Sequence, residues 1–298
     1  MKIIEIDINN VEMVNKDLQL CLGYFDGLHL GHLRLIKEAI KHGPTGVMTF
    51  DISPHLYLKK VPLYSTLTSL ADKADILEEL GVKYLFVLRT NDELIHFDKK
   101  EFIDKILLKL NPNKIYVGED YRFGYMGKGT PHYLSKFIPT KVVKLYVKNN
   151  KKISSSYIID LIKQGNVKEA HKLLSRPYSL SGLVVEGNKK GQELGFPTAN
   201  LDLDFPYVLP KIGVYIGYSY FMSRKRKAII SVSTHPTFQE LDKPIVEVHI
   251  IGFDENIYGR FLKVEFISYI RDVVKYDSLD ELKEQLEKDK NLAIKRLK

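Results

Sequence analysis

Two histidines three residues apart give the sequence its clearest chemical signal. His29 and His32 lie in residues 23–32, GYFDGLHLGH, between a short apolar run and a segment with apolar residues at helical spacing. A strand, a glycine-rich turn and a helix start together form a common anion-binding site, because glycines let the backbone approach the anion and free N–H groups donate to it. Imidazoles on the first helical turn could also donate to phosphate oxygens whose charge rises in a transition state. The pattern therefore indicates nucleotidyl transfer, although it also fits a glycine-rich turn with two surface histidines.

A second group of chemically useful residues occupies residues 191–200, GQELGFPTAN. Two glycines, a proline, a hydroxyl and an amide within ten residues predict a shaped loop with oxygen ligands. Such a loop suits the phosphates of a magnesium–nucleotide complex. The same composition also fits an ordinary barrel loop.

Glu247 is the third candidate, within the strand-like segment VEVH. Alternation along a strand places Glu247 and His249 on one face and apolar residues on the other. On an inner barrel face the carboxylate would serve as a general base for a substrate hydroxyl. On an outer face it would equally pair with a neighbouring lysine or arginine, and the sequence leaves both arrangements open.

The elements that must position these residues differ between the two halves of the chain. In the first half, strands alternate with helices, which predicts a parallel sheet with helices on its faces. Ligands of such sheets bind beyond the carboxyl ends of the strands, so the loops at residues 23–32, 50–55 and 118–124 should meet on one rim. The expected strands are residues 45–50, 83–88, 114–117 and 141–147, and the expected helices are residues 69–80 and 99–110.

Near the end of the first half, serines at residues 154–156 are expected to cap a helix ending near Gln164, and their hydroxyls can also hold phosphate.

The second half has the residue pattern of an all-β protein. Evenly spaced strands from Tyr178 onward predict a closed barrel or a sandwich. A capping box at Ser278 opens a terminal helix that should cover it. We expect two domains, residues 1–174 and 175–298.

Composition narrows the class of protein. The chain has 298 residues, 44% of them hydrophobic, and a net charge of +8. It contains no apolar run near the roughly 18 residues that span a membrane and no signal-like start, which predicts a cytoplasmic protein. The single Cys21 excludes a disulfide within the chain. The basic run at residues 224–227 is expected at a solvated hairpin tip, and without an aromatic strand face beside a basic stripe we expect no nucleic-acid binding.

Seven motifs in order resemble the bacterial bifunctional riboflavin kinase/FMN adenylyltransferase family, also called FAD synthetase, over nearly the whole chain. Seven short motifs in the right order are jointly specific, although each alone is weak. They are residues 23–32, 49–50, 118–124, 153–159, 191–200, 236–238 and 247–249.

The resemblance implies a fold and two reactions. It implies an N-terminal Rossmann-like nucleotidyltransferase domain followed by a C-terminal antiparallel β-barrel flavokinase domain with a terminal helix, an α/β architecture overall. The barrel would transfer phosphate from ATP to riboflavin, giving FMN and ADP. The first domain would join FMN to the AMP part of a second ATP, giving FAD and pyrophosphate. Mg²⁺ is expected at both sites, because it neutralises polyphosphate charge.

The resemblance also assigns residues to the two sites. His29 and His32 would steady the phosphate charge in the first domain, and Glu247 would be the base in the second. Thr198 and Asn200 would be the metal ligands. The other ATP- or phosphate-binding positions of the adenylyltransferase would be Gly23, Phe25, Asp26, Gly31, Asp120, Ser154 and Ser155. ATP, magnesium and flavin binding in the kinase would involve Gly191, Gly195, Pro197, Thr198 and Asn200.

The chain departs from the family pattern at three places. Ile159 replaces an arginine, and Ser156 stands for a threonine beside it. Gln192 replaces another arginine, and residues 231–235 replace an Asn-x-Gly-x-Arg segment. These changes leave open a protein that is only a kinase, a non-catalytic flavin- or nucleotide-binding regulator, and an adenylyltransferase for another phosphorylated substrate.

Overall fold

A computed structural model describes residues 1–60, 65–144, 146–148, 151–187, 195–234 and 244–298. The chain forms two compact units, Met1–Ser155 and Ser156–Lys298. Helices α8 (Ser155–Lys163) and α9 (Val167–Leu174) therefore fall almost entirely in the second unit by their contacts. The functional boundary expected from the sequence, between residues 174 and 175, stays a prediction.

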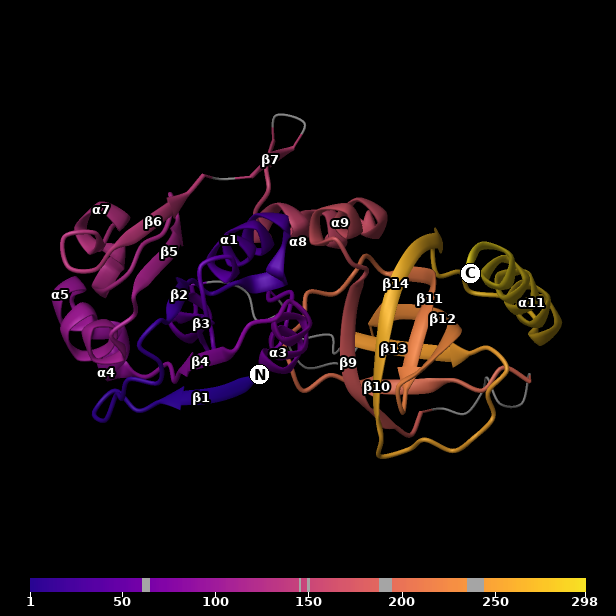
Figure 1. Ribbon diagram of the computed structural model, residues 1–298. Helices are drawn as coiled ribbons and strands as arrows, with labels where there is room; N and C mark the ends of the chain where they lie inside the picture. Colours follow the sequence, from indigo (N-terminus) through magenta and orange to yellow (C-terminus); the bar gives the residue numbers. More distant parts are fainter. Residues whose placement is uncertain (61–64, 145, 149–150, 188–194, 235–243) are drawn as a thin grey trace. The chain divides into compact units, whose positions relative to one another are not determined.

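The first unit is built on a six-stranded sheet in which every pair of neighbouring strands is parallel (Figure 1). Its order is β1-β4-β3-β2-β5-β6. The strands are β1 (Lys2–Ile6), β2 (Gln19–Leu22), β3 (Thr45–Phe50), β4 (Tyr84–Leu88), β5 (Lys114–Gly118) and β6 (Thr140–Val143). The expected parallel sheet is thus confirmed. The expected strand at residues 141–147 is wrong in its length, because β6 ends at Val143 and Val147 belongs to a separate hairpin of β7 (Val147–Lys148) with β8 (Lys151–Lys152).

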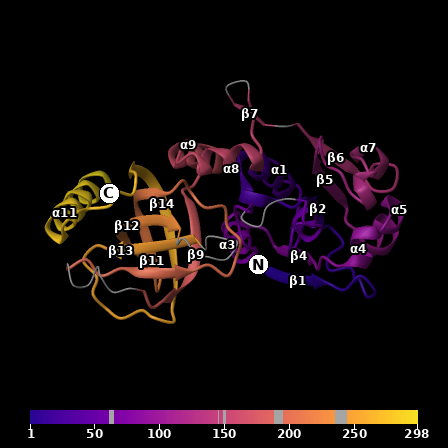
Figure 2. The same cartoon turned by 180° about the vertical axis from the view of Figure 1, so that it is seen from behind.

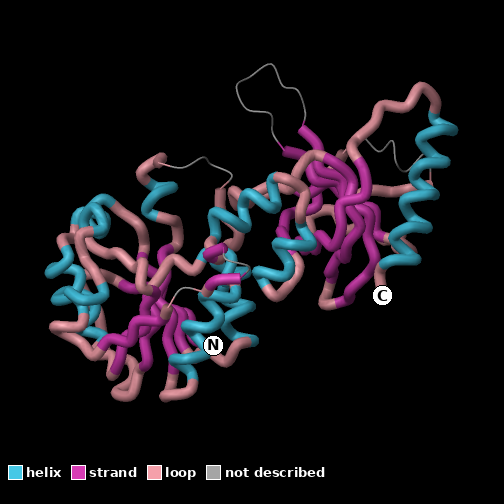
Figure 3. The backbone as a smooth tube through the Cα atoms, turned by 90° about the horizontal axis from the view of Figure 1, so that it is seen from above, coloured by secondary structure: helices cyan, strands magenta, loops and turns pink. Residues whose placement is uncertain are grey.

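Helices cover both faces of this sheet (Figure 3). Alternate residues of β4 show why, since Leu85 belongs to one buried apolar cluster and Phe86 to another. The first cluster contains residues of α1 (Leu30–Ile40) and α3 (Leu70–Glu79), and the second contains the helical stretch of residues 102–110. That stretch consists of α5 (Lys99–Phe102), the π-helical η2 (Ile103–Leu107) and α6 (Leu108–Leu110). The shorter helices are η1 (Asp26–Leu28), α2 (Pro54–Tyr57), α4 (Asp92–His96), η3 (Tyr125–Gly127) and α7 (Pro131–Leu134).

The second unit is a closed antiparallel barrel, as expected. Its order is β10-β13-β12-β11-β14-β9, with β9 and β10 also paired. The strands are β9 (Tyr178–Val185), β10 (Ala199–Asp202), β11 (Gly213–Phe221), β12 (Arg224–Thr234), β13 (Pro244–Ile250) and β14 (Phe261–Arg271). Alternate side chains such as Leu180, Ile230 and Val248 are fully buried and fill the interior.

The terminal helix α11 (Leu279–Arg296) packs on the outside of the barrel beside β11 and β12 (Figure 2). Ala293 and Leu297 bury against Val214, Ile216 and Ile229. The hydroxyl of Ser278 accepts a hydrogen bond from the Glu281 N–H, so the helix start read from the sequence is confirmed. None of the helices in the described part of the chain is long and apolar enough to cross a membrane.

The basic run at residues 224–227 is not a hairpin tip. It forms the start of β12, and the turn before it is made by Met222 and Ser223, whose φ angles are 48° and 61°. Two consecutive positive φ angles match the right-handed twist of a tight hairpin. All four residues of the run pair with β11 in the strand ladder, and Lys225 also lies over the Tyr218 ring, 3.7 Å from its centroid.

Candidate functional sites

The loops that follow β2, β3 and β5 meet at one cavity of about 930 Å³. The cavity is lined by Leu22 to Tyr24 after β2, by Phe50 to His55 after β3 and by Asp120 to Gly127 after β5, among other residues. The expectation that these loops share one rim is therefore confirmed for Gly23 and Tyr24 and for the loops after β3 and β5, whereas His29 and His32 are not among the described residues that line this cavity. The cavity lies where the ligands of parallel sheets bind, beyond the carboxyl ends of the strands.

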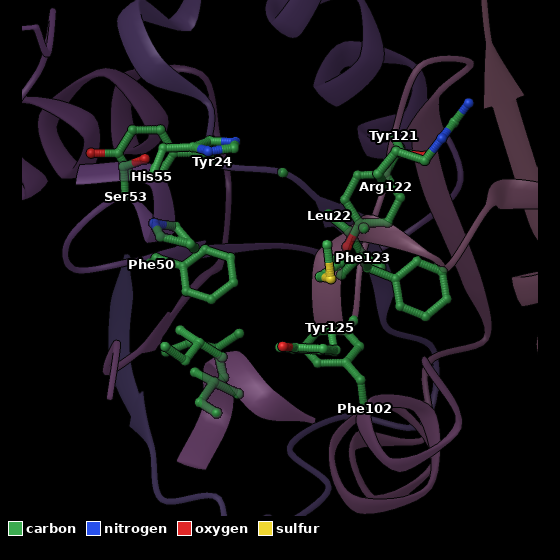
Figure 4. Close-up of a pocket in the computed structure, with 18 of the residues that line it drawn as sticks. Leu22, Tyr24, Phe50, Ser53, His55, Phe102, Tyr121, Arg122, Phe123 and Tyr125 are labelled. Carbon is green, nitrogen blue, oxygen red and sulfur yellow. The ribbon is translucent and has the colours of Figure 1, made fainter. Parts of the chain in front are cut away.

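Aromatic rings form much of this cavity wall. Figure 4 shows Tyr24 and Phe50 on one side and Tyr121, Phe123 and Tyr125 on the other. Tyr121 and Phe123 stack on each other with ring centroids 5.8 Å apart. Opposed rings bind flat aromatic ligands by stacking, so the cavity suits a planar ring system.

The paired histidines lie at the start of α1. His29 is the N-cap residue, and its Nδ1 accepts a long hydrogen bond, 3.4 Å, from the His32 N–H. The two imidazoles stack with centroids 3.7 Å apart and an interplanar angle of 17°. A Cβ at Gly31 would lie 3.1 Å from Cε1 of His29, so glycine at this position leaves room for the His29 ring. The structure thus brings both histidines together at a helix N-terminus.

The turn before them has a strained backbone. Phe25 and Leu28 have φ angles of 53° and 41°, values that favour glycine. Phe25 is buried, and its ring meets the edge of His32 with centroids 5.2 Å apart. A Cβ at Gly23 would lie 3.1 Å from the Phe25 ring. Strain of this kind persists only where the surroundings determine the conformation, and it is common at functional sites.

Asp26 ties this turn to residues 67–68. Its buried carboxylate accepts hydrogen bonds from the N–H groups of Leu67 and Thr68 and from the Thr68 hydroxyl. Burial raises the pKa of Asp26, while the Lys73 ammonium and these hydrogen bonds oppose the rise. The carboxylate of Asp26 is therefore directed at residues 67–68, and it fixes the loop that carries the histidines.

The remaining candidates of the first unit come from two segments. Asp120 lines the cavity and forms an ion pair with Lys152, whose Nζ lies 2.6 Å from Oδ2. The hydroxyl of Ser155 donates a hydrogen bond of 2.9 Å to the carbonyl of Asp26. Ser154 is half-buried directly before it. The serine segment is thus fastened to the same turn as the histidines.

In the barrel, strand register brings two candidates together. Asn200 on β10 lies directly opposite Glu247 on β13. Residues opposite each other in an antiparallel pair present their side chains on the same face. This face is the outer one, because Val246 and Val248 on either side of Glu247 are fully buried in the interior. The alternation read from the sequence is confirmed. Of the two arrangements left open, the inner-face one is wrong, because Glu247 lies half-buried on the outer face opposite Asn200.

The segment before β10 borders a second, smaller cavity. Pro197, Thr198 and Ala199 line a space of about 210 Å³ together with residues 253–258. His249 fastens this segment to β13, since its Nδ1 lies 2.9 Å from the Pro197 carbonyl oxygen and its ring packs on Phe196. Burial lowers the pKa of His249.

The two glycines of the segment 191–200 can be compared with the structure only in part. Gly191 and its neighbour Gln192 lie outside the described residues, as do residues 236–238. Gly195 is described and has a φ angle of 80°, a conformation that favours glycine.

Sequence reasoning missed Gly187. A Cβ built there would lie 1.9 Å from Nδ2 of Asn200, so the Asn200 amide packs directly on the Gly187 backbone. The nearest sequence signal is the position of this glycine just beyond the end of β9, and only the pairing of β9 with β10 reveals its neighbour.

The side-chain donors of the barrel site, Thr198 and Asn200, fit magnesium better than a transition metal. Among the described residues, no three His, Cys, Asp or Glu side chains come together as a metal-binding group. Thr198 and Asn200 offer oxygen donors, and Mg²⁺ is usually held by one or two protein oxygens together with nucleotide phosphates and water.

The first unit is thus an α/β unit with a cavity at its strand ends, and the second is an antiparallel barrel. A family model described as FAD synthetase matches residues 11–157, and one described as riboflavin kinase matches residues 174–297. The chain belongs to the family of bifunctional riboflavin kinase/FMN adenylyltransferases.

Individual relatives cover both units. The chain is 36% identical over 288 residues to the bifunctional riboflavin kinase/FMN adenylyltransferase of Bacillus subtilis, covering 93% of this chain and 91% of that protein. It is 33% identical over 293 residues to the protein of that description from Listeria monocytogenes, covering 95% and 91%. A crystal structure from Streptococcus pneumoniae, titled a macrolide-efflux protein, is 33% identical with a TM-score of 0.89 and covers 98% of this chain and 99% of that one.

Proposed function

We propose that this chain makes FAD from riboflavin in two ATP-dependent steps at two separate sites. The observation that carries the proposal is that each unit matches its own family model and keeps its own cluster of polar groups. Riboflavin, FMN and ATP are the substrates, and FAD, ADP and pyrophosphate are the products. We assign adenylyl transfer to residues 1–174 and the kinase to residues 175–298, in the cytoplasm.

In the kinase step, Glu247 acts from the outer barrel face, opposite Asn200. It takes the proton of the terminal ribityl hydroxyl, and the oxygen attacks the γ-phosphorus of ATP. The oxygen–phosphorus bond forms as the bond to ADP breaks, giving FMN and ADP. Asn200, opposite Glu247 in the strand ladder, and Thr198 before it hold the nucleotide phosphates. Mg²⁺ held by these two oxygen donors would neutralise polyphosphate charge.

In the adenylyl step, a phosphate oxygen of FMN attacks the α-phosphorus of a second ATP, and pyrophosphate leaves. The attacking phosphate is already ionised, so no base is required, and positioning and charge stabilisation supply the catalysis. The stacked His29 and His32 and the N-terminus of α1 donate to the phosphates. The aromatic cavity of about 930 Å³ holds the planar ring system of the flavin.

The absence of an arginine at Ile159 is compatible with this assignment. The Lys152 ammonium lies 2.6 Å from Asp120 at the edge of the cavity that Asp120 lines, and we propose that it turns from this ion pair to the ATP phosphates when they bind.

The test is a product assay. Purified protein incubated with riboflavin, ATP and Mg²⁺ is expected to form FMN and then FAD, separated by chromatography. FMN that accumulates without FAD, even when FMN itself is supplied, would show a kinase alone. Flavin binding without either product would show a regulator.

A further inference from the structure

Lys73, on α3, is a buried lysine that the proposed reactions do not use. Only 1% of its surface is exposed. Lysine is almost never fully buried unless its charge has partners. The contacts of this ammonium therefore indicate what it does.

The ammonium contacts Tyr24, a residue of the turn, at both its backbone carbonyl and its ring. Nζ donates a hydrogen bond of 2.9 Å to the Tyr24 carbonyl, and it lies 3.6 Å from the centroid of the Tyr24 ring. It also lies 3.4 Å from Oγ1 of Thr49 on β3, which itself donates to the Tyr24 carbonyl at 2.8 Å. The peptide between Tyr24 and Phe25 is thus fixed immediately before the first strained residue.

The same ammonium is the cation that acts on Asp26. The charge of Asp26 keeps the lysine charged against its burial, and the charge of Lys73 limits the rise in the pKa of Asp26. The attraction between these two opposite charges and the hydrogen bonds that Asp26 accepts from residues 67–68 fix the conformation of the turn at residues 25–28.

A charge at this position is costly for folding. Burial lowers the pKa of Lys73 to about 8, and the Asp26 carboxylate limits that fall. Replacing a whole buried ion pair by apolar side chains is often neutral or stabilising, whereas removing one partner leaves the other charge buried, here that of Asp26. A buried charge with this desolvation cost points to a role beyond packing.

We propose that Lys73 is a positioning residue for adenylyl transfer: its ammonium fixes the Tyr24 carbonyl and ring, and thereby the turn that carries His29 and His32 to the phosphates. The inference rests on the proposed function of the first unit. Lys73 touches the turn and not the substrate, so it acts through the geometry of Tyr24 and the residues that follow.

The first test is Lys73→Met, with Lys37→Met as the control that removes an exposed lysine from α1. The kcat for FAD formation from FMN should fall about 10- to 100-fold, because small displacements of catalytic groups cost that much. The KM for ATP should change less than kcat, and riboflavin phosphorylation by the same chain should stay within twofold. Lys37→Met should leave both steps unchanged.

A pH profile separates positioning from packing. As pH rises through about 8, Lys73 loses its charge, which removes its cation–π contact with the Tyr24 ring and weakens its hydrogen bond to the Tyr24 carbonyl. Wild-type adenylyl transfer should therefore decline with an apparent pKa near 8. The titratable groups that face the ammonium are Asp26 and Tyr24, and Asp51 acts on Tyr24. Lys73→Met should lack this alkaline decline.

Thr49→Val is the second variant, and it tests the same contact should Lys73→Met fail to fold. It removes the hydroxyl that shares the Tyr24 carbonyl with the ammonium, and it should lower the kcat of adenylyl transfer about threefold to tenfold. In the double variant the two losses should combine to less than their product, because both act on one carbonyl.

Lys73→Met with a kcat within twofold of wild type, or with an unchanged alkaline decline, would overturn the inference. So would a Thr49→Val protein with wild-type kcat. A wild-type protein that forms no FAD from FMN would instead contradict the proposed function itself.

Discussion

The two candidate sites of this protein are held in shape by different kinds of interaction. In the α/β unit, the histidines follow a turn with two strained residues, and buried polar side chains from other elements support that turn. In the barrel, Asn200 faces Glu247 because β10 and β13 pair in one register. One site depends on side chains that are distant in sequence, and the other depends on a backbone ladder.

This difference predicts where each site is vulnerable. A ladder fixes neighbouring side chains through many backbone hydrogen bonds, so only residues at or directly beside the pair should matter. A strained turn keeps its shape only while its surroundings determine it, so changes on α3 or β3 should also reach the histidines. Each substitution below tests one side of this contrast, and both activities can be measured in one chain.

The largest effect is expected for Glu247→Gln. The amide keeps the size of the side chain and cannot accept the hydroxyl proton as a base, so FMN formation should fall about 10²- to 10⁴-fold. Conversion of supplied FMN to FAD should be unchanged, which serves as the internal control. Equal loss of both steps in a folded protein would break the assignment of two sites.

His32→Ala should produce the opposite pattern. Loss of one donor to the developing phosphate charge should slow FAD formation from FMN about 10²- to 10³-fold, while riboflavin phosphorylation continues. The rates of the two steps are followed separately by chromatography of the flavins. A wild-type rate of adenylyl transfer would show that the imidazole is only part of a surface turn.

Gly187→Ala tests the ladder site from the neighbouring strand. The new Cβ would displace the Asn200 amide, so the kinase should lose roughly tenfold in kcat/KM for ATP, as expected for a displaced binding group. On an Asn200→Ala background the same change should cost little more, because the displaced group is already absent. Additive losses in the double variant would show that Gly187 acts elsewhere.

The smallest effect is expected for Gly31→Ala. Alanine favours a helix over glycine by about 1 kcal/mol, so the thermal stability of the first unit should hold or rise. The new Cβ would press on the His29 ring, and adenylyl transfer should fall about threefold to tenfold. Calorimetry and the FAD assay together test this, and unchanged activity would mean that the His29 orientation is not critical.

Local patterns in the sequence predicted much of the fold. The capping box of Ser69 with Asp72 starts α3 as expected, and alternating apolar residues identified β13. The order of the motifs gave the family, and the loops after successive strands predicted the rim on which they meet. The basic run at residues 224–227 was expected at the hairpin tip, but the tip is the pair Met222 and Ser223, and the run forms the start of β12 directly after it.

The sequence by itself determined the element types, the motif order and the family, because helix caps, strand alternation and glycine turns depend on residues a few positions apart. Tertiary structure decided that Asp26 bonds to Leu67, 41 residues away, and that Lys73 holds Tyr24, 49 residues away. It also decided that Glu247 lies outside the barrel opposite Asn200. Burial and strand register depend on which distant segments pack together, and no local spacing encodes that choice.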